Sequence, residues 1–143
     1  MSRPAAPGGR PGLERLHHVQ LSCPPDGEDA ARGFWVDAVG LAEAGKPSSL
    51  VPRGGCWFLA TGTGLAVHVG VEDPFTPATR AHPALLVADI AALDELARRL
   101  RAAGFDVRPD DLLPGYRRFY TDDAHGNRVE FLTRDPTTAS PGF

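Results

Sequence analysis

The chain has 143 residues and a formal net charge of −3 at pH 7, with 15 Lys and Arg against 18 Asp and Glu. This length is typical of one domain, and an acidic protein has no long-range attraction for nucleic acid or anionic lipid. No uninterrupted apolar stretch approaches the roughly 20 residues that span a bilayer. We therefore expect neither nucleic acid nor a membrane as a partner.

The N-terminal sequence MSRPAAPGGRPG has Pro and Gly where a secretory signal carries an apolar run. Two cysteines, Cys23 and Cys56, can form at most one bridge, so we expect a cytoplasmic protein with free thiols. Residues 1–12 and 135–143 lack periodic apolar residues and are predicted to be flexible tails. A single domain is expected over residues 13–134.

The first half of the domain, residues 13–72, predicts a strand, a helix and then a hairpin. Prolines close the first strand, and the helix is expected to be capped by Asp26 and to end at Gly40. The turn sequence Thr-Gly-Thr-Gly between two apolar runs indicates the hairpin. The predicted strands are residues 16–22, 56–60 and 65–71, and the predicted helix is residues 27–39.

A linker over residues 72–80 precedes the second half, residues 81–134, which repeats the order of the first. Asp89 is expected to cap a long helix with an apolar stripe, and Gly104 to end it. The predicted elements are a strand at 82–87, the helix at 90–103, and strands at 106–108, 117–121 and 128–132. The pattern indicates an α+β fold built from a duplicated module rather than a solenoid.

Four potential metal ligands occupy equivalent places in the two halves. His18 and His68 lie in the first and last strands of the first half, and His82 and Glu130 in those of the second. Strand alternation places them on the polar faces, opposite the residues that face the helices. If each sheet curls with its helix outside, all four line one concave cleft. These side chains suit zinc, nickel, iron(II) or manganese, so we predict one divalent ion per chain.

Other polar residues are candidates for substrate contacts or for structure. Gln20, Arg118 and Tyr120 are candidate substrate contacts, Arg118 because arginine binds anionic groups. His17 falls on the apolar face of its strand and is expected to be a packed or edge residue. His125 is expected to be a turn residue in a surface loop.

At these residues the chain resembles the vicinal oxygen chelate superfamily, which includes glyoxalase I, extradiol dioxygenases, fosfomycin-modifying enzymes and bleomycin-binding proteins. The resemblance covers about residues 14–133. It is carried by Leu-His-His-Val-Gln-Leu at 16–21, Gly-Phe-Trp-Val-Asp-Ala-Val-Gly-Leu at 33–41, Leu-Ala-Val-His-Val-Gly at 65–70, Ala-His-Pro at 81–83 and Gly-Asn-Arg-Val-Glu-Phe at 126–131. It implies two βαβββ modules that form an open, barrel-like cleft around a divalent metal, commonly in a homodimer. The linker is long enough for the cleft to form within one chain or between two.

The resemblance leaves the reaction open. Metal-dependent glyoxalase I usually brings two carboxylates to its metal, whereas here His68 takes the place of one, so Glu130 is the only candidate base. The dioxygenases and fosfomycin enzymes have a His-His-Glu set, which would correspond to His18, His82 and Glu130. We favour a glyoxalase I-like lyase or isomerase acting on a small molecule chelated through vicinal oxygens. The alternatives are an extradiol-type ring-cleaving dioxygenase and, from another class, a metal-free small-molecule binding protein like those of bleomycin resistance.

Overall fold

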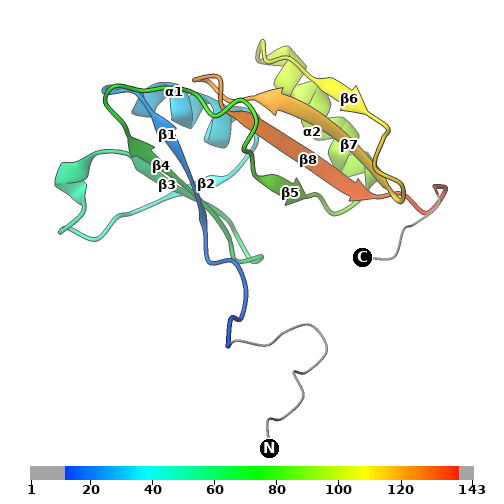
Figure 1. The fold of residues 1–143 in the computed structure, drawn as a ribbon, viewed down its shortest axis with the longest axis horizontal. Helices are drawn as coiled ribbons and strands as arrows, with labels where there is room; N and C mark the ends of the chain where they lie inside the picture. Colours follow the sequence, from blue (N-terminus) through cyan, green and yellow to red (C-terminus); the bar gives the residue numbers. More distant parts are fainter. Residues whose placement is uncertain (1–11, 139–143) are drawn as a thin grey trace, which may run out of the picture.

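The computed structural model describes residues 12–138, whose strands form two four-stranded sheets lying side by side (Figure 1). The first module contains β1 (Val19–Cys23), α1 (Glu28–Arg32), η1 (Gly33–Ala38), β2 (Ala42–Ala44), η2 (Val51–Arg53), β3 (Cys56–Ala60) and β4 (Leu65–Val71). The second contains β5 (Ala84–Leu86), α2 (Ile90–Ala102), β6 (Arg108–Asp110), β7 (Tyr116–Asp122) and β8 (Arg128–Arg134). The duplicated α+β architecture predicted from the sequence is confirmed.

Both sheets have the same topology. The strand orders are β1-β4-β3-β2 and β5-β8-β7-β6, with the first strand of each module parallel to its last and the other pairs antiparallel. The register places Gln20 and Trp57 on either side of His68, and Ala84 and Tyr120 on either side of Glu130. His68 on β4 and Glu130 on β8 therefore each lie between a parallel and an antiparallel neighbouring strand.

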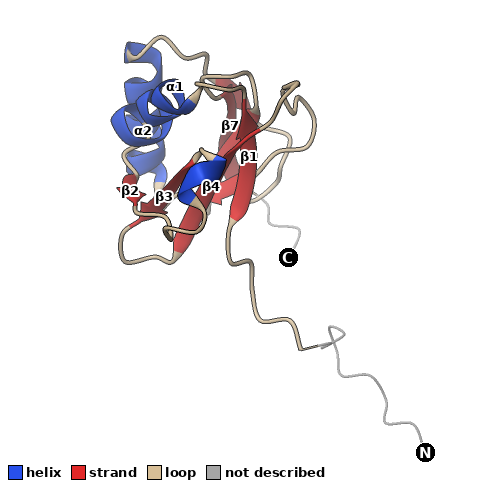
Figure 2. Cartoon of the chain, turned by 90° about the vertical axis from the view of Figure 1, so that its left-hand side faces the viewer, coloured by secondary structure: helices blue, strands red, loops and turns tan. Residues whose placement is uncertain are grey.

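The two modules share one hydrophobic core. The helices α1 and α2 lie together on one side of the sheets (Figure 2), and Phe34, Trp35 and Leu100 are fully buried there. The rings of Phe34 in the first module and Phe105 in the second meet edge to face, with 5.0 Å between centroids. Because the helix-facing sides of both sheets are committed to this core, the opposite sides remain available for a site.

The turn between β7 and β8 joins the second module to the first through hydrogen bonds. The buried Asn127 side chain donates hydrogen bonds to the Ser22 carbonyl at 2.8 Å and to Asp123 Oδ2 at 2.9 Å, and it accepts one from the Ala78 N–H at 3.0 Å. His125 Nε2 lies 2.8 Å from the Gly27 carbonyl oxygen. His125 is thus half-buried between the modules, which corrects its prediction as a surface turn residue.

Replacing Asn127 by alanine is expected to destabilise the fold by about 2 to 3 kcal/mol, because it leaves buried polar partners without a hydrogen bond. The comparison variant is Asp89→Ala, which removes the exposed cap of α2 and should cost about 1 kcal/mol. Urea unfolding of the two variants measures both effects. Equal losses of stability in the two variants would contradict the conclusion that the hydrogen bonds of Asn127 stabilise the fold more than the cap of α2 does.

Several local predictions hold closely. The hairpin strands β3 and β4 have the predicted bounds, and Asp89 Oδ1 accepts a hydrogen bond from the Ala92 N–H at 2.8 Å as the cap of α2. Cys23 and Cys56 are buried free thiols, as expected, and burial raises the pKa of Cys23 to about 11. No helix within residues 12–138 is long and apolar enough to cross a membrane.

Other local predictions need correction. The strand β2 was not predicted, because three residues are too few to carry a periodic pattern. No side chain caps α1, and Asp26, the predicted cap, lies one residue too early with φ 63°. Asp135 is buried and its N–H donates to the Gly115 carbonyl at 2.9 Å, so residues 135–138 pack against the domain rather than belonging to a tail. The remaining predicted tail residues, 1–11 and 139–143, lie outside the described residues.

Candidate functional site

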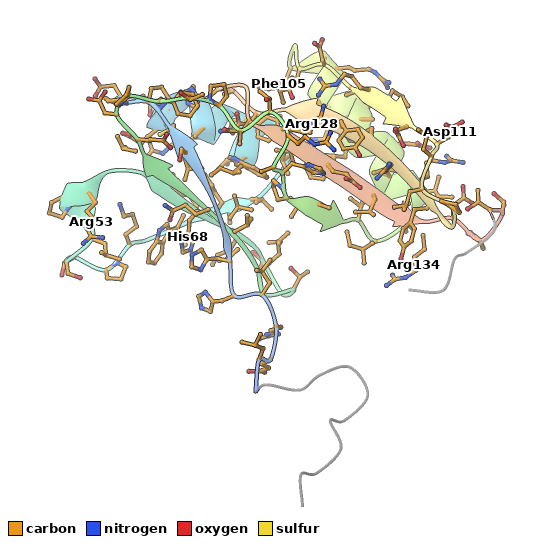
Figure 3. All side chains as sticks on the ribbon, in the orientation of Figure 1. Arg53, His68, Phe105, Asp111, Arg128 and Arg134 are labelled. Carbon is orange, nitrogen blue, oxygen red and sulfur yellow. The ribbon has the colours of Figure 1, made fainter. Side chains whose placement is uncertain are left out.

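On the first module the candidate ligands lie within a stack of three rings on the face opposite the helices. His68, on β4, packs against His18 on one side and Trp57 on the other, with ring centroids 4.0 and 4.2 Å apart and planes within 16° and 9° of parallel. His68, which Figure 3 labels on the first module, is buried. Burial, together with the neighbouring His18 and His17, lowers the pKa of His68. A lowered pKa favours neutral imidazole, the form that binds metals.

His17 and His18 do not lie in the first strand, where they were predicted. β1 begins at Val19, so His17 and His18 precede the strand and are both exposed. Their Nδ1 atoms are 3.0 Å apart, and both side chains line the same cavity as His68. The assignment of His17 to the packed apolar face is therefore wrong, because strand alternation does not extend to residues outside the strand.

On the second module Glu130 forms the centre of a buried polar cluster. His82 Nε2 is 2.9 Å from Glu130 Oε1, and Arg118 Nη1 is 3.3 Å from Glu130 Oε2. Arg118 also donates to Asp110 through Nε at 2.9 Å and Nη2 at 2.8 Å. Burial alone would lower the pKa of Arg118, but the hydrogen bond to Asp110 and the charge of Glu130 raise it overall. The cluster holds Glu130 in one orientation.

Both ring nitrogens of His82 face oxygen acceptors. Nδ1 lies 2.8 Å from the Arg80 carbonyl oxygen, and Nε2 faces the Glu130 carboxylate. When Nδ1–H donates to the carbonyl, the Nε2 lone pair points at Glu130 Oε1, and two electron-rich atoms need a cation between them. A proton or a metal ion satisfies this requirement. The chemistry of the His82 and Glu130 pair therefore fits a metal ion.

The four candidate ligands do not converge within one chain. His18 pairs with His68 on the first module and His82 with Glu130 on the second. Among residues 12–138, no three His, Cys, Asp or Glu side chains of a single chain are grouped so as to hold an ion. The single-chain cleft considered in the sequence analysis is therefore not formed by the described residues, because the shared core places the modules side by side.

The candidate substrate residues divide between the two modules. Gln20 is exposed and lines the cavity beside His68. Tyr120 lies edge-on to His82, with centroids 5.5 Å apart, and the guanidinium carbons of Arg118 and Arg128 lie 5.2 and 5.0 Å from its ring centroid. The engagement of Arg118 with two carboxylates leaves it less available to an anionic substrate than predicted.

Sequence reasoning missed Trp57, Lys46 and Arg53, which line the His68 cavity. Trp57 could have been found by alternation, because its neighbours Cys56 and Phe58 face the core. Lys46 and Arg53 lie in the loop before β3, where no periodic signal exists. They reach the site only through the folding of that loop.

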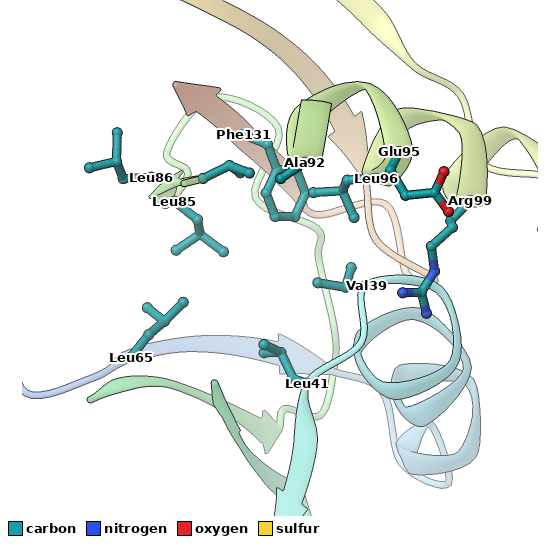
Figure 4. Close-up of a pocket in the computed structure, with 11 residues that line it drawn as sticks. Val39, Leu41, Leu65, Leu85, Leu86, Ala92, Glu95, Leu96, Arg99 and Phe131 are labelled. Carbon is teal, nitrogen blue, oxygen red and sulfur yellow. The ribbon is translucent and has the colours of Figure 1, made fainter. Parts of the chain in front are cut away.

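A separate apolar cavity of about 330 Å³ lies between the modules, beside α2 (Figure 4). It is lined by Leu41, Leu65, Leu85, Leu96 and Phe131, among others. None of the four candidate metal ligands lines it. The polar faces therefore remain the candidate site.

Comparison with known proteins agrees with this architecture. The family model of the Glyoxalase/Bleomycin resistance protein/Dioxygenase superfamily matches residues 2–131. The chain belongs to this superfamily. Its two modules and their strand order are the superfamily fold. No curated protein sequence matches the chain.

Solved structures of the superfamily share the fold. A glyoxalase family protein from Bacillus anthracis is 40% identical with a TM-score of 0.79, over 86% of this chain and 97% of that one. A glyoxalase/dioxygenase from Nostoc punctiforme is 18% identical with a TM-score of 0.70, over 94% and 99%. The fosfomycin resistance protein FosX from Listeria monocytogenes is 18% identical with a TM-score of 0.67, over 87% and 96%. The last two likenesses concern the fold alone.

Proposed function

We propose that this chain is a metal-dependent enzyme that acts on a small molecule chelated through vicinal oxygens, with glyoxalase I-like lyase or isomerase chemistry favoured. The supporting observation is the pair of donor sets on equivalent faces of the two modules: stacked imidazoles on one, and an imidazole aimed at a buried carboxylate on the other. Three imidazoles and a carboxylate suit zinc, nickel, manganese or iron(II). The Bacillus anthracis relative, described as a glyoxalase family protein, supports the choice of reaction.

We propose further that the site forms between two chains. The core that both modules share places them side by side, and within residues 12–138 neither donor pair is grouped with the other pair of its own chain. In a symmetric homodimer the first module of one chain can face the second module of its partner, and twofold symmetry then produces two equivalent sites. Each site would contain His18 and His68 from one chain and His82 and Glu130 from the other.

The residues of the cluster would take distinct roles in this site. His18, His68 and His82 would hold the ion, which when bound would supply Lewis-acid chemistry to the substrate oxygens. Glu130 would complete the ligand set or accept a substrate proton at Oε1, because Arg118 holds its Oε2. The hydrogen bond from His82 Nδ1–H to the Arg80 carbonyl would keep Nε2 directed at the ion.

A second candidate, extradiol-type ring cleavage, is favoured by one observation. His68 is packed between His18 and Trp57 and its ring is largely enclosed. If His68 serves only to support His18, the remaining ligands are His18, His82 and Glu130. Two histidines and one carboxylate form the set that non-haem iron(II) oxygenases use.

Protein purified without chelator is expected to contain about one divalent ion per chain and to have a mass of about 30 kDa in solution, twice that of the 15.2 kDa chain. Elemental analysis and light scattering measure the two quantities.

An activity screen with α-hemithioacetals and catechols separates the two reaction types. A protein that takes up none of zinc, nickel, manganese or, anaerobically, iron(II) would contradict the enzyme proposal, and the small-molecule binding protein would replace it.

A further inference from the structure

The cavity beside His68 has a distinct electrostatic character. It encloses about 530 Å³ on the helix-free face of the first module, between β1, β3, β4 and the loop before β3. Its ionisable lining consists of His17, His18, His68, Lys46 and Arg53, and no carboxylate lines it. A local concentration of cations in a chain of net charge −3 attracts anions.

The two permanent charges of this cavity are not neutralised by the protein. Within residues 12–138 neither Lys46 nor Arg53 forms an ion pair, whereas five arginines of the domain do: Arg32, Arg98, Arg108, Arg117 and Arg118. Arg118 on the second module provides the contrast, because it is bound to both Asp110 and Glu130. Lys46 is the single lysine of the sequence, and the sequence alone assigns it no role.

The loop that carries these cations is anchored to the sheet. Lys46 Nζ donates a hydrogen bond to the Gly54 carbonyl, which joins the two ends of the loop. Gly55 has φ 84°, and a Cβ there would collide with the Val69 carbonyl oxygen. Only glycine allows this close approach to β4. The loop therefore holds Lys46 and Arg53 in the lining of the cavity, and Arg53 lies farther from the second module than His68 does (Figure 3).

The floor of the same cavity is aromatic. Trp57, His68 and His18 form the continuous stack described above, and the side-chain amide of Gln20 packs against Gly70, which has no side chain to displace it. A ligand in the cavity would thus contact both the aromatic rings and two cations. These features suit a small organic molecule with a terminal oxyanion.

We propose that Lys46 and Arg53 form an anion subsite that binds a carboxylate, phosphate or phosphonate group of the substrate. The inference deepens the proposed function, because the subsite opens onto His18 and His68, and it restricts the substrate to molecules that carry an oxyanion in addition to the chelating oxygens. Binding of the anion itself requires no metal, since both cations belong to the protein. This independence allows a separate test.

The test is a titration of the chelator-treated, full-length protein with inorganic phosphate at constant ionic strength, followed by tryptophan fluorescence. Trp57 lines the cavity whereas Trp35 is fully buried, so the signal is expected to disappear in Trp57→Phe. Saturable binding is expected, weakened at least about tenfold in Lys46→Gln and in Arg53→Gln. The matched control is Arg101→Gln on the exposed side of α2, which should leave the Kd unchanged.

Three further probes distinguish the oxyanion chemistry. Acetate and methylphosphonate are expected to compete with phosphate, and the tighter of the two identifies the preferred group, whereas neutral glycerol should have no effect. Phosphate binding that is absent, or that Lys46→Gln and Arg53→Gln leave unchanged, would overturn the subsite. Metal uptake of the same variants is measured in parallel and is expected to remain. A protein that binds phosphate but no metal would refute the proposed enzyme and support the subsite. A protein that binds metal but no phosphate would refute the subsite and leave the proposed enzyme standing.

Discussion

Mixing His18→Ala subunits with Glu130→Ala subunits is expected to restore metal binding that neither variant has alone. If the site forms between chains, the mixed dimer combines an intact first module from the Glu130→Ala subunit with an intact second module from the His18→Ala subunit. One of its two sites is then complete. After free subunit exchange, about one quarter of all sites should recover, and equilibrium dialysis against zinc measures the fraction.

The matched control is a mixture of His82→Ala and Glu130→Ala subunits. Both substitutions lie in the second module, so every site in the mixed dimer lacks one ligand and no recovery is expected. If metal binding recovers in neither mixture, the site does not combine ligands from two chains. A monomer with full metal content would also refute the dimeric site and require a rearrangement of the modules within one chain.

The local structure was largely predictable because its signals are local. The hairpin of β3 and β4 follows from two apolar runs around a glycine-rich turn, and the cap and stripe of α2 follow from Asp89 and its helical spacing. The equivalence of His68 and Glu130 follows from duplication, because both occupy the last strand of a module. Alternation then places each of them on a helix-free face.

The arrangement of the modules could not be predicted, because it depends on packing between distant residues. The edge-to-face contact of Phe34 with Phe105 and the hydrogen bonds of Asn127 to Ser22 and Ala78 join segments that no sequence pattern connects. These contacts decide that the donor pairs lie apart in one chain. His17 illustrates a smaller limit, because the strand that should have buried it begins two residues later.

Glu130→Gln is expected to weaken metal binding more than about 100-fold, beyond the usual effect of losing an outer-shell partner. The substitution keeps the shape of the side chain and an oxygen that can accept from Arg118, but it removes the charge that faces His82 Nε2. Because an amide is a poor ligand for zinc or nickel compared with a carboxylate, the ion should be lost. Competitive chelator titration measures the affinity.

Asp110→Asn is the matched control, since Asp110 is the other carboxylate bound to Arg118. The backbone N–H of Leu112 and the hydrogen bonds from Arg118 lower the pKa of Asp110, so the carboxylate is ionised at neutral pH and both variants remove one negative charge from the same guanidinium. Only Glu130 also faces His82. Metal affinity that falls equally in the two variants would mean that Glu130 acts through the charge of the Arg118 cluster and not as a ligand. A loss confined to Glu130→Gln would place the carboxylate itself on the ion.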